Sequence, residues 1–309
     1  MNEKISRREF LKLQARNSLL LAGTTSGLLL PGMGLASAGP DIGVARGDAV
    51  AATRAAVDLI GGIGRVVKKG SRVLIKPNMS FPRSPDQATN THPEVVKTVA
   101  VMCKEAGASK IMVLDHTLAS GKVCIQASGI GPALASVDPN MVHAINNPSF
   151  YKEVRIEQAK SLARTDVAKE TLKADVLIAV PVAKSHSATG VSLSMKGMMG
   201  LIYDRGIMHR MDLNETIVDL AVMLKADLAV VDATRVLSTG GPGGPGKVLK
   251  RDTVIASTDM VAADAYTVGA FEWYGKKFKP FQVRHVRLAH ERGLGRADVE
   301  NLSVKTVTL

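Results

Sequence analysis

Lysine and histidine side chains gather in one short stretch of this sequence, PVAKSHSATGVSLSMKGMMG at residues 181–200. Lys184, His186 and Lys196 stand there among small residues and glycines. Ammonium groups form strong hydrogen bonds with carboxylates and phosphates, and an imidazole can donate or accept a proton. This combination predicts a site for a small anion, in which Lys184, His186 and Lys196 are the candidate catalytic residues.

Further candidate ligand-binding residues stand in two earlier segments, VLIKPN and NTHPEVV. They are Lys76, Asn78, Thr91 and His92. Thr91 and His92 directly precede Pro93, a residue common in the first helical turn, where free backbone N–H groups favour an anion. Lys76 would add a third ammonium group to a positively charged cradle for a carboxylate or phosphate.

The same histidines also permit a divalent metal ion. Imidazole and carboxylate groups are common metal ligands, and His92, Asp115 and His186 supply both kinds. His116 and Asp232 are further donors of the same types. No two of these histidines have a close local spacing such as HxxxH. The sequence therefore leaves both the metal site and the anion cradle open.

The elements that must position these residues alternate between strands and helices. Aliphatic runs typical of strands buried on both faces occur at 71–77, 109–116, 174–181 and 226–233, with shorter candidates at 252–258 and 302–309. Amphipathic helices are predicted at 48–60, 93–107, 213–225, 259–273 and 281–292. This alternation predicts an α/β layered fold, a mostly parallel sheet flanked by helices. The less regular segment 130–175 is expected to form an inserted or edge subregion.

The ends of the predicted strands explain why the candidate residues should meet. Ligands collect at the carboxyl ends of parallel strands. The four main strands lead into Lys76-Pro77-Asn78, Asp115-His116, Pro181 followed by Lys184, and Asp232 to Arg235. Any single strand can become polar simply where it reaches water. Four such ends together predict one shared site.

Two glycine-rich stretches resemble nucleotide-binding loops but lack the required features. In GPGGPGKV (241–248), Val248 replaces the hydroxyl residue that binds Mg²⁺, and two prolines remove backbone donors. We expect a flap or a tight surface loop there. GGIGRVV (61–67) follows a predicted helix and precedes a strand, the reverse of a dinucleotide fingerprint.

The N-terminal segment 1–38 has the pattern of a twin-arginine export signal. Its features are Arg7-Arg8 followed by Phe10, Leu11 and Lys12, an apolar stretch from Leu19 to Leu30, and the small-x-small cleavage sequence Ala36-Ser37-Ala38. The apolar stretch is short for a hydrocarbon core of ~30 Å. We therefore expect the Tat translocase to export the protein to the periplasm, with cleavage leaving residues 39–309 as a single domain without a membrane span.

Charge and cysteine content narrow the function. Removing the signal, which has five basic and two acidic residues, lowers the formal net charge from +12 to +9, and a basic surface favours anionic ligands. Nucleic acid is disfavoured, because aromatic residues make up only 4% and no recognition motif occurs. The two cysteines cannot ligate an iron–sulfur cluster by themselves. Cys103 is expected in a helix core, and the sequence leaves open whether Cys103 and Cys124 are free or paired.

Several of these motifs together resemble the domain-of-unknown-function family DUF362. The resemblance is carried by Lys76-Pro77-Asn78, Thr91-His92-Pro93, Lys184-x-His186 and Lys196-Gly197. It implies the fold and the place of the site rather than a reaction. Some members of that family carry ferredoxin-like iron–sulfur modules, whose cysteine clusters this chain lacks.

Two functions follow as expectations. The first is an exported, metal- or redox-associated protein with a strand-end site for a small anion, which would be an enzyme if that anion is a substrate. The second is a non-catalytic accessory protein that binds an anion or partners a periplasmic redox complex. Twin-arginine export often follows cofactor insertion, which makes a cofactor, such as a divalent metal ion, an expectation for either function.

Overall fold

A 10-stranded sheet organises residues 39–309, the residues that the computed structural model describes. The export signal expected in 1–38 lies outside these described residues. The strands are β1 (Ile42–Arg46), β2 (Arg72–Pro77), β3 (Lys110–Asp115), β4 (Val142–Ala144), β7 (Val176–Val180), β8 (Val182–His186), β9 (Gly190–Ser192), β10 (Leu228–Leu237), β11 (Val248–Ser257) and β14 (Val304–Thr308).

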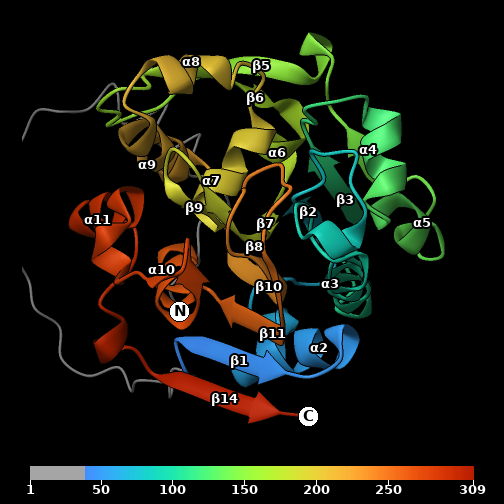
Figure 1. The fold of residues 1–309 in the computed structure, drawn as a ribbon. Helices are drawn as coiled ribbons and strands as arrows, with labels where there is room; N and C mark the ends of the chain where they lie inside the picture. The colour runs from blue at the N-terminus through green and yellow to red at the C-terminus, as the bar shows by residue number, and fades with distance from the viewer. Residues whose placement is uncertain (1–38) are drawn as a thin grey trace, which may run out of the picture.

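Most neighbouring strands of this sheet are parallel. The order is β14-β1-β11-β10-β7-β2-β3-β4, and in addition β8 pairs with β10 and β9 pairs with β8 (Figure 1). β10, β7, β2, β3 and β4 form consecutive parallel pairs, whereas β11 runs antiparallel to both β1 and β10. The predicted α/β fold with a mostly parallel, helix-flanked sheet is confirmed.

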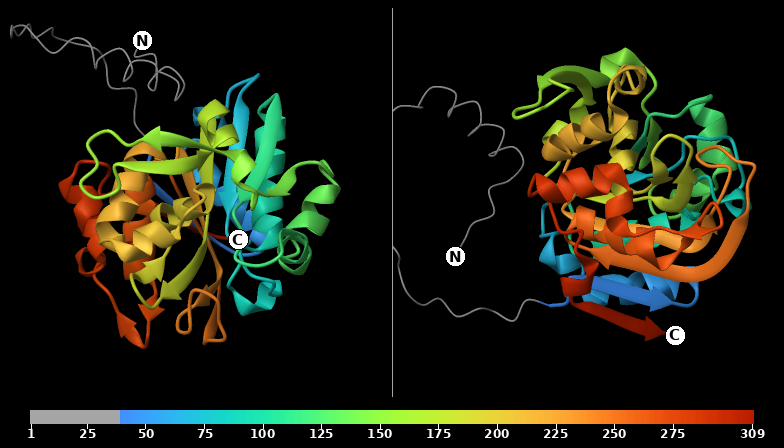
Figure 2. Two further views of the ribbon diagram at one scale, coloured as in Figure 1. Left: turned by 90° about the horizontal axis from the view of Figure 1, so that it is seen from above. Right: turned by 60° about the vertical axis from the view of Figure 1, so that its left-hand side comes forward.

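Helices cover both faces of the sheet. The α-helices are α2 (Ala49–Leu59), α3 (Pro93–Glu105), α4 (Gly121–Ala127), α5 (Ile130–Ala135), α6 (Lys169–Lys173), α7 (Ser194–Gly197), α8 (Gly206–Arg210), α9 (Leu213–Met223), α10 (Met260–Ala270) and α11 (Arg284–Glu291). In the left view of Figure 2 the yellow-to-red helices and the green-to-cyan helices lie on opposite sides of the strands.

Two hydrophobic cores result from this layering. Successive side chains of a strand point to opposite faces. Accordingly Leu74 of β2 packs in the core shared with α9 to α11, whereas Val73 and Ile75 pack in the core shared with α2 and α3. Cys103 is buried in the second core as expected, and both Cys103 and Cys124 are free thiols.

Two parts of the sheet differ from the predicted pattern. β10 continues to Leu237, so Asp232 and Arg235 lie inside a strand rather than at its end. Residues 182–192, for which no strand was predicted, form the antiparallel pair β8–β9. Strand pairing supplies partners for backbone groups that a loop would leave to water, and this allows polar side chains to lie deep in the fold.

The segment 130–175 lies at the β4 edge of the sheet. Besides α5, β4 and α6 it contains a separate two-stranded sheet of β5 (Tyr151–Arg155) and β6 (Arg164–Ala168). A further antiparallel pair of two-residue strands, β12 (Glu272–Trp273) and β13 (Lys276–Lys277), follows α10. Within 39–309, no helix has the length and apolar character needed to cross a membrane.

Candidate anion site

Three lysines lie buried where β2, β8 and α7 meet. Lys76 and Lys184 each expose only 3% of their surface, and Lys196 exposes 9%. The charges of Lys196, Lys76 and Asp115 all act on the Lys184 ammonium. We call these four residues, Lys76, Asp115, Lys184 and Lys196, the lysine cluster. The fold thus brings together three lysines that are far apart in the sequence.

One lysine of the cluster has a carboxylate partner. The Nζ of Lys76 lies 3.0 Å from Oδ1 of Asp115. The other carboxylate oxygen, Oδ2, accepts hydrogen bonds of 2.9 Å from the Met79 N–H and the Ser80 hydroxyl. Burial lowers the pKa of Lys76, and the Asp115 carboxylate opposes this shift and partly compensates the buried charge.

The other two lysines have only neutral partners. Lys184 donates to the Thr89 carbonyl over 2.7 Å, and its Nζ lies 5.0 Å from the centre of the Phe81 ring. Lys196 donates to the Met199 sulfur over 3.5 Å. Among the carboxylates of residues 39–309, none forms an ion pair with either lysine. The cluster therefore contains more buried positive charge than its protein partners neutralise.

Burial and nearby positive charges lower the pKa values of these two amines. Burial, followed by the charge of Lys196, lowers the pKa of Lys184 to about 7. Burial, followed by the charge of Arg205, lowers the pKa of Lys196 to about 8. Both amines therefore exchange protons near neutral pH, unlike an exposed lysine.

The histidines beside the cluster are neutral. Burial and the charges of Lys196 and Lys184 lower the pKa of His186 to about 3. Its Nδ1 accepts a 3.1 Å hydrogen bond from the Ala188 N–H, so the ring proton must sit on Nε2. His186 is thus a hydrogen-bond donor at neutral pH, and Lys184 has the pKa better suited to proton transfer.

Three basic residues near the cluster were not foreseen from the sequence. The charge of Arg205 adds to burial in lowering the pKa of Lys196, and burial followed by the charge of Lys196 lowers the pKa values of His209 and His285. His285 is completely buried in α11, and its Nε2 has no hydrogen-bond partner. These residues lie on α8, on α11 or just before α8, and nothing in their local sequence connects them with a site. Only the packing of these helices brings them near Lys196.

Two backbone features hold the cluster in place. The Ser194 and Met195 N–H groups donate to the buried Asp264 carboxylate over 2.8 and 2.9 Å, which fixes the start of α7 and hence Lys196. Gly200 lies against the Lys76–Asp115 pair, where any side chain would collide with both partners.

The glycine–proline loop 239–247 packs over the Lys184 side of the cluster. The Gly241 N–H donates to the Ser185 hydroxyl over 3.0 Å, and a side chain at Gly241 would collide with the Ser185 backbone. Gly243 lies next to Phe81, and Gly244 next to Thr89. The loop leads into β11, so the predicted tight loop without a phosphate-binding helix is confirmed.

Asn78 and Thr91, predicted to bind the ligand, use their side chains within the fold. Asn78 accepts a 3.0 Å hydrogen bond from the Val182 N–H. The Thr91 hydroxyl accepts from the Asn78 N–H over 2.9 Å and donates to the Val180 carbonyl over 2.7 Å. These bonds connect the end of β2 to the β7–β8 junction. Both residues therefore position strands that carry the lysines.

His92 is the N-cap of α3 and lies apart from the lysine cluster. The His92 Nδ1 accepts a hydrogen bond from the Glu94 backbone N–H over 3.1 Å. The backbone N–H of His92 donates to the Asp232 carboxylate over 2.7 Å. Together with Arg235 and Lys250, His92 lines a separate cavity of about 620 Å³. Burial, followed by the charge of Arg235, lowers the pKa of His92.

The predicted metal ligands are not assembled. In the described part of the chain, no three His, Cys, Asp or Glu side chains are grouped so that they could hold a metal ion. Of the predicted set, Asp115 is paired with Lys76, while His92 and His186 each accept a hydrogen bond from a nearby backbone N–H. The predicted lysines therefore meet in one site, whereas the predicted metal ligands His92, Asp115 and His186 do not form a group.

Comparison with known proteins places this chain in a family. The chain is 28% identical over 228 residues to the thylakoid-associated protein sll1697 of Synechocystis sp., covering 71% of this chain and 68% of that protein. The lactate racemase apoprotein of Thermoanaerobacterium thermosaccharolyticum matches with a TM-score of 0.45 at 12% identity, and the match covers 70% of this chain and 54% of that one. The profile of the domain of unknown function DUF362 matches residues 73–269, which include the whole lysine cluster. The chain belongs to the DUF362 family.

Proposed function

We propose that the lysine cluster binds a small anion with a carboxylate or phosphate group. The observation that carries this proposal is the presence of two buried lysines, Lys184 and Lys196, without a carboxylate partner within residues 39–309. Burying an unpaired charge costs several kcal/mol, on the order of the stability of a whole domain, so an anion from solution would relieve that cost.

Unbonded polar atoms around the cluster support the same function. Thr89 Oγ1 and His285 Nε2 are buried and have no hydrogen-bond partner. Thr89 also supplies the carbonyl that accepts from Lys184, and the charge of Lys196 acts on His285. Since buried polar groups are nearly always hydrogen-bonded, these atoms mark places where a ligand or water would complete the network.

The arrangement also assigns roles if the anion is a substrate. The Lys196 ammonium and the Nε2–H of His186 would bind its negative charge, and Lys184 would transfer the proton, because its pKa of about 7 lies near the working pH. The protein would then be an enzyme that acts on a small anion in the periplasm, reached by twin-arginine export. If no reaction occurs, the same site serves a periplasmic binding or accessory protein.

Thermal unfolding in phosphate or acetate, with chloride at equal ionic strength as reference, tests the proposal. A bound anion at 100 times its Kd should stabilise the protein by about 2.7 kcal/mol. Lys184→Met and Lys196→Met should remain folded and lose this response, while Lys305→Met, at an exposed position, should keep it. An equal response in all four proteins would exclude the site. Turnover of a bound anion by the wild type, absent in Lys184→Met, would distinguish the enzyme from the binding protein.

A further inference from the structure

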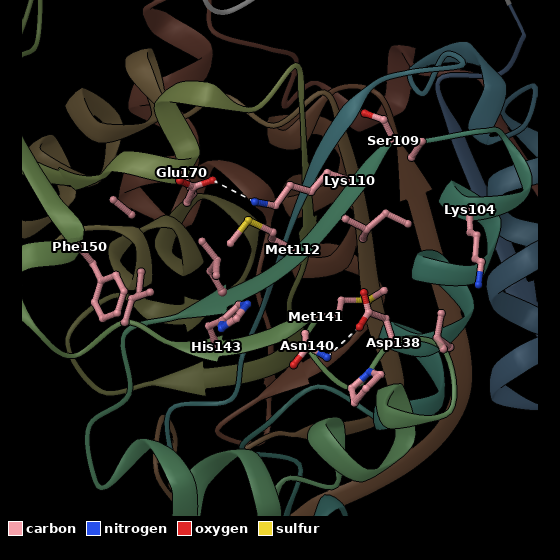
Figure 3. A pocket seen from close by; sticks show the side chains of 17 residues that line it. Lys104, Ser109, Lys110, Met112, Asp138, Asn140, Met141, His143, Phe150 and Glu170 are labelled. Carbon is pink, nitrogen blue, oxygen red and sulfur yellow. Dashed lines mark hydrogen bonds and ion pairs between the residues drawn. The ribbon is translucent and has the colours of Figure 1, made fainter.

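A second cavity, of about 850 Å³, lies at the β4 edge of the sheet, away from the lysine cluster (Figure 3). Residues of β3, β4 and the β6–α6 segment line it, and none of the lysine-cluster residues does. Its volume falls in the range of about 300–1,000 Å³ that is typical of small-molecule sites. It is therefore large enough for a ligand of its own.

Much of the cavity wall is apolar. Met112 of β3 and Phe150, which precedes β5, have side chains directed into the space shown in Figure 3. Ile111, Leu114, Met141 and Ile145 also contribute to the wall. Phe150 exposes 47% of its surface, so part of its ring is free to contact a ligand in this cavity. An apolar ligand group would cover it.

Positive charge surrounds Glu170, which lines this cavity together with Lys110. Glu170 is paired with Lys173 at 2.7 Å, with Arg72 at 3.4 Å and with Lys110 at 3.8 Å. Figure 3 shows the Lys110 side chain extended toward Glu170. At 3.8 Å this is an ion pair without a hydrogen bond, so the three ammonium donors of Lys110 remain available for a closer anion. Because three cations surround one carboxylate, this region favours the binding of a second negatively charged group.

The edge of β3 adds main-chain hydrogen-bonding groups to the wall. β4 pairs with β3 only from Val113 to Asp115, and the Val113 N–H bonds to the Met141 carbonyl. The backbone groups of every second residue in a strand point toward the same neighbouring strand. The Ile111 N–H and carbonyl therefore point to the same side as those of Val113, at a position that β4 does not reach. The turn at Asp138–Asn140, which precedes β4, lines the same cavity as Ile111.

We infer that this cavity binds an anionic amphiphile, a molecule with a carboxylate or similar head group and an apolar body of medium length. The head group lies at Lys110, where it replaces the distant Glu170 as the nearest acceptor. The apolar body lies against Met112 and Phe150. This site is independent of the anion site in the lysine cluster, since it takes its affinity from apolar contact as well as from charge.

Displacement of the fluorescent anion 8-anilino-1-naphthalenesulfonate by decanoate or decanol tests this inference on the folded chain. Decanoate should displace the probe with saturation and bind roughly tenfold more tightly than decanol, the difference expected for about 1.4 kcal/mol. Lys110→Met should remove that preference and leave decanol binding unchanged. Phe150→Ser, at an exposed position, should weaken both ligands.

Three controls make the result decisive. Lys305→Met should bind both ligands as the wild type does, and Lys184→Met should retain decanoate binding while losing the phosphate response of the lysine cluster. Equal affinity for decanoate and decanol in the wild type, or an equal loss in Lys110→Met and Lys305→Met, would overturn the inference. Lys110-dependent sedimentation with phosphatidylglycerol vesicles, in the absence of decanoate binding, would also overturn it and indicate a membrane head group.

Discussion

Two buried charged groups in this protein have opposite surroundings. Asp219 of α9 accepts backbone hydrogen bonds of 2.8–2.9 Å from Lys160, Ser161 and Leu162, and its Oδ1 lies 2.7 Å from the Arg292 guanidinium. Burial raises its pKa, but these hydrogen bonds outweigh burial and leave the pKa below its usual value. Lys184 has one carbonyl acceptor and an aromatic ring, and its pKa falls to about 7.

The difference separates a structural charge from a functional one. The partners of Asp219 stabilise its charged form, so this carboxylate fixes the 158–162 turn against α9 and α11. The surroundings of Lys184 disfavour its charged form. This arrangement lowers the stability of the folded state and holds no structural element in place. Strong pKa shifts that oppose the charged state are typical of functional sites. The comparison therefore supports placing the site at Lys184 rather than at Asp219.

Removing the Asp219 carboxylate should have the largest effect on stability. In Asp219→Ala the Arg292 charge and three backbone N–H groups lose their common acceptor, and we expect a loss of about 3–5 kcal/mol in the free energy of unfolding. Denaturant unfolding measures this loss. Asp204→Ala removes an exposed carboxylate 3.3 Å from Arg210 and should cost about 1 kcal/mol or less. Equal losses in the two variants would show that the Asp219 network is not structural.

Stability of the ligand-free protein should rise with pH in the alkaline range. The unfolded chain binds a proton on Lys184 up to its ordinary pKa of 10.5, whereas the folded chain releases it near pH 7. The unfolded state thus binds more protons between these values, and the free energy of unfolding increases with pH there. We expect a contribution of about 2–3 kcal/mol, less than the full pKa shift implies at about 1.4 kcal/mol per unit, because the buried site relaxes.

Lys184→Met sharpens this pH experiment. The variant should be at least as stable as the wild type at pH 7 and should show a smaller rise toward pH 10, with Lys196 accounting for what remains. Phosphate affinity of the wild type should weaken over the same range as the lysines lose their protons. Identical pH profiles for the two proteins would mean that Lys184 is an ordinary lysine and would remove the contrast with Asp219.

His92→Ala should have the smallest effect. The variant loses the side chain that caps α3, which typically costs about 1 kcal/mol. Because His92 lies apart from the lysine cluster, thermal stabilisation by phosphate should be unchanged. If the phosphate response disappeared as in Lys184→Met, His92 would have to belong to the anion site, as its sequence position first indicated.

The sequence predicted the scaffold well because scaffold signals are local. Runs such as VLIKP and ADVLIAV are long and aliphatic enough to indicate buried strands, and β2 and β7 lie within the predicted ranges. The antiparallel direction of β11 was not predictable, since strand direction depends on partners far away in the sequence. The same limit explains why β10 was expected to end at Ala233 rather than Leu237.

Among the site residues, the sequence indicated chemical type but not distance. Lys76, Lys184 and Lys196 were recognised because ammonium groups at or after the ends of predicted strands suit a small anion. The packing of the elements decided that these three meet, that His92 does not join them, and that Asp115 neutralises only one.

The amino-acid sequence by itself determined the α/β architecture, the membership of the DUF362 family and the kind of charge available for a site, because periodicity and residue type are properties of neighbouring residues. Tertiary structure alone decided which charges are left without a partner. Burial, desolvation and pairing depend on atoms brought together by folding, and Lys184 and Asp219 became different only when the sheet and its helices closed around them.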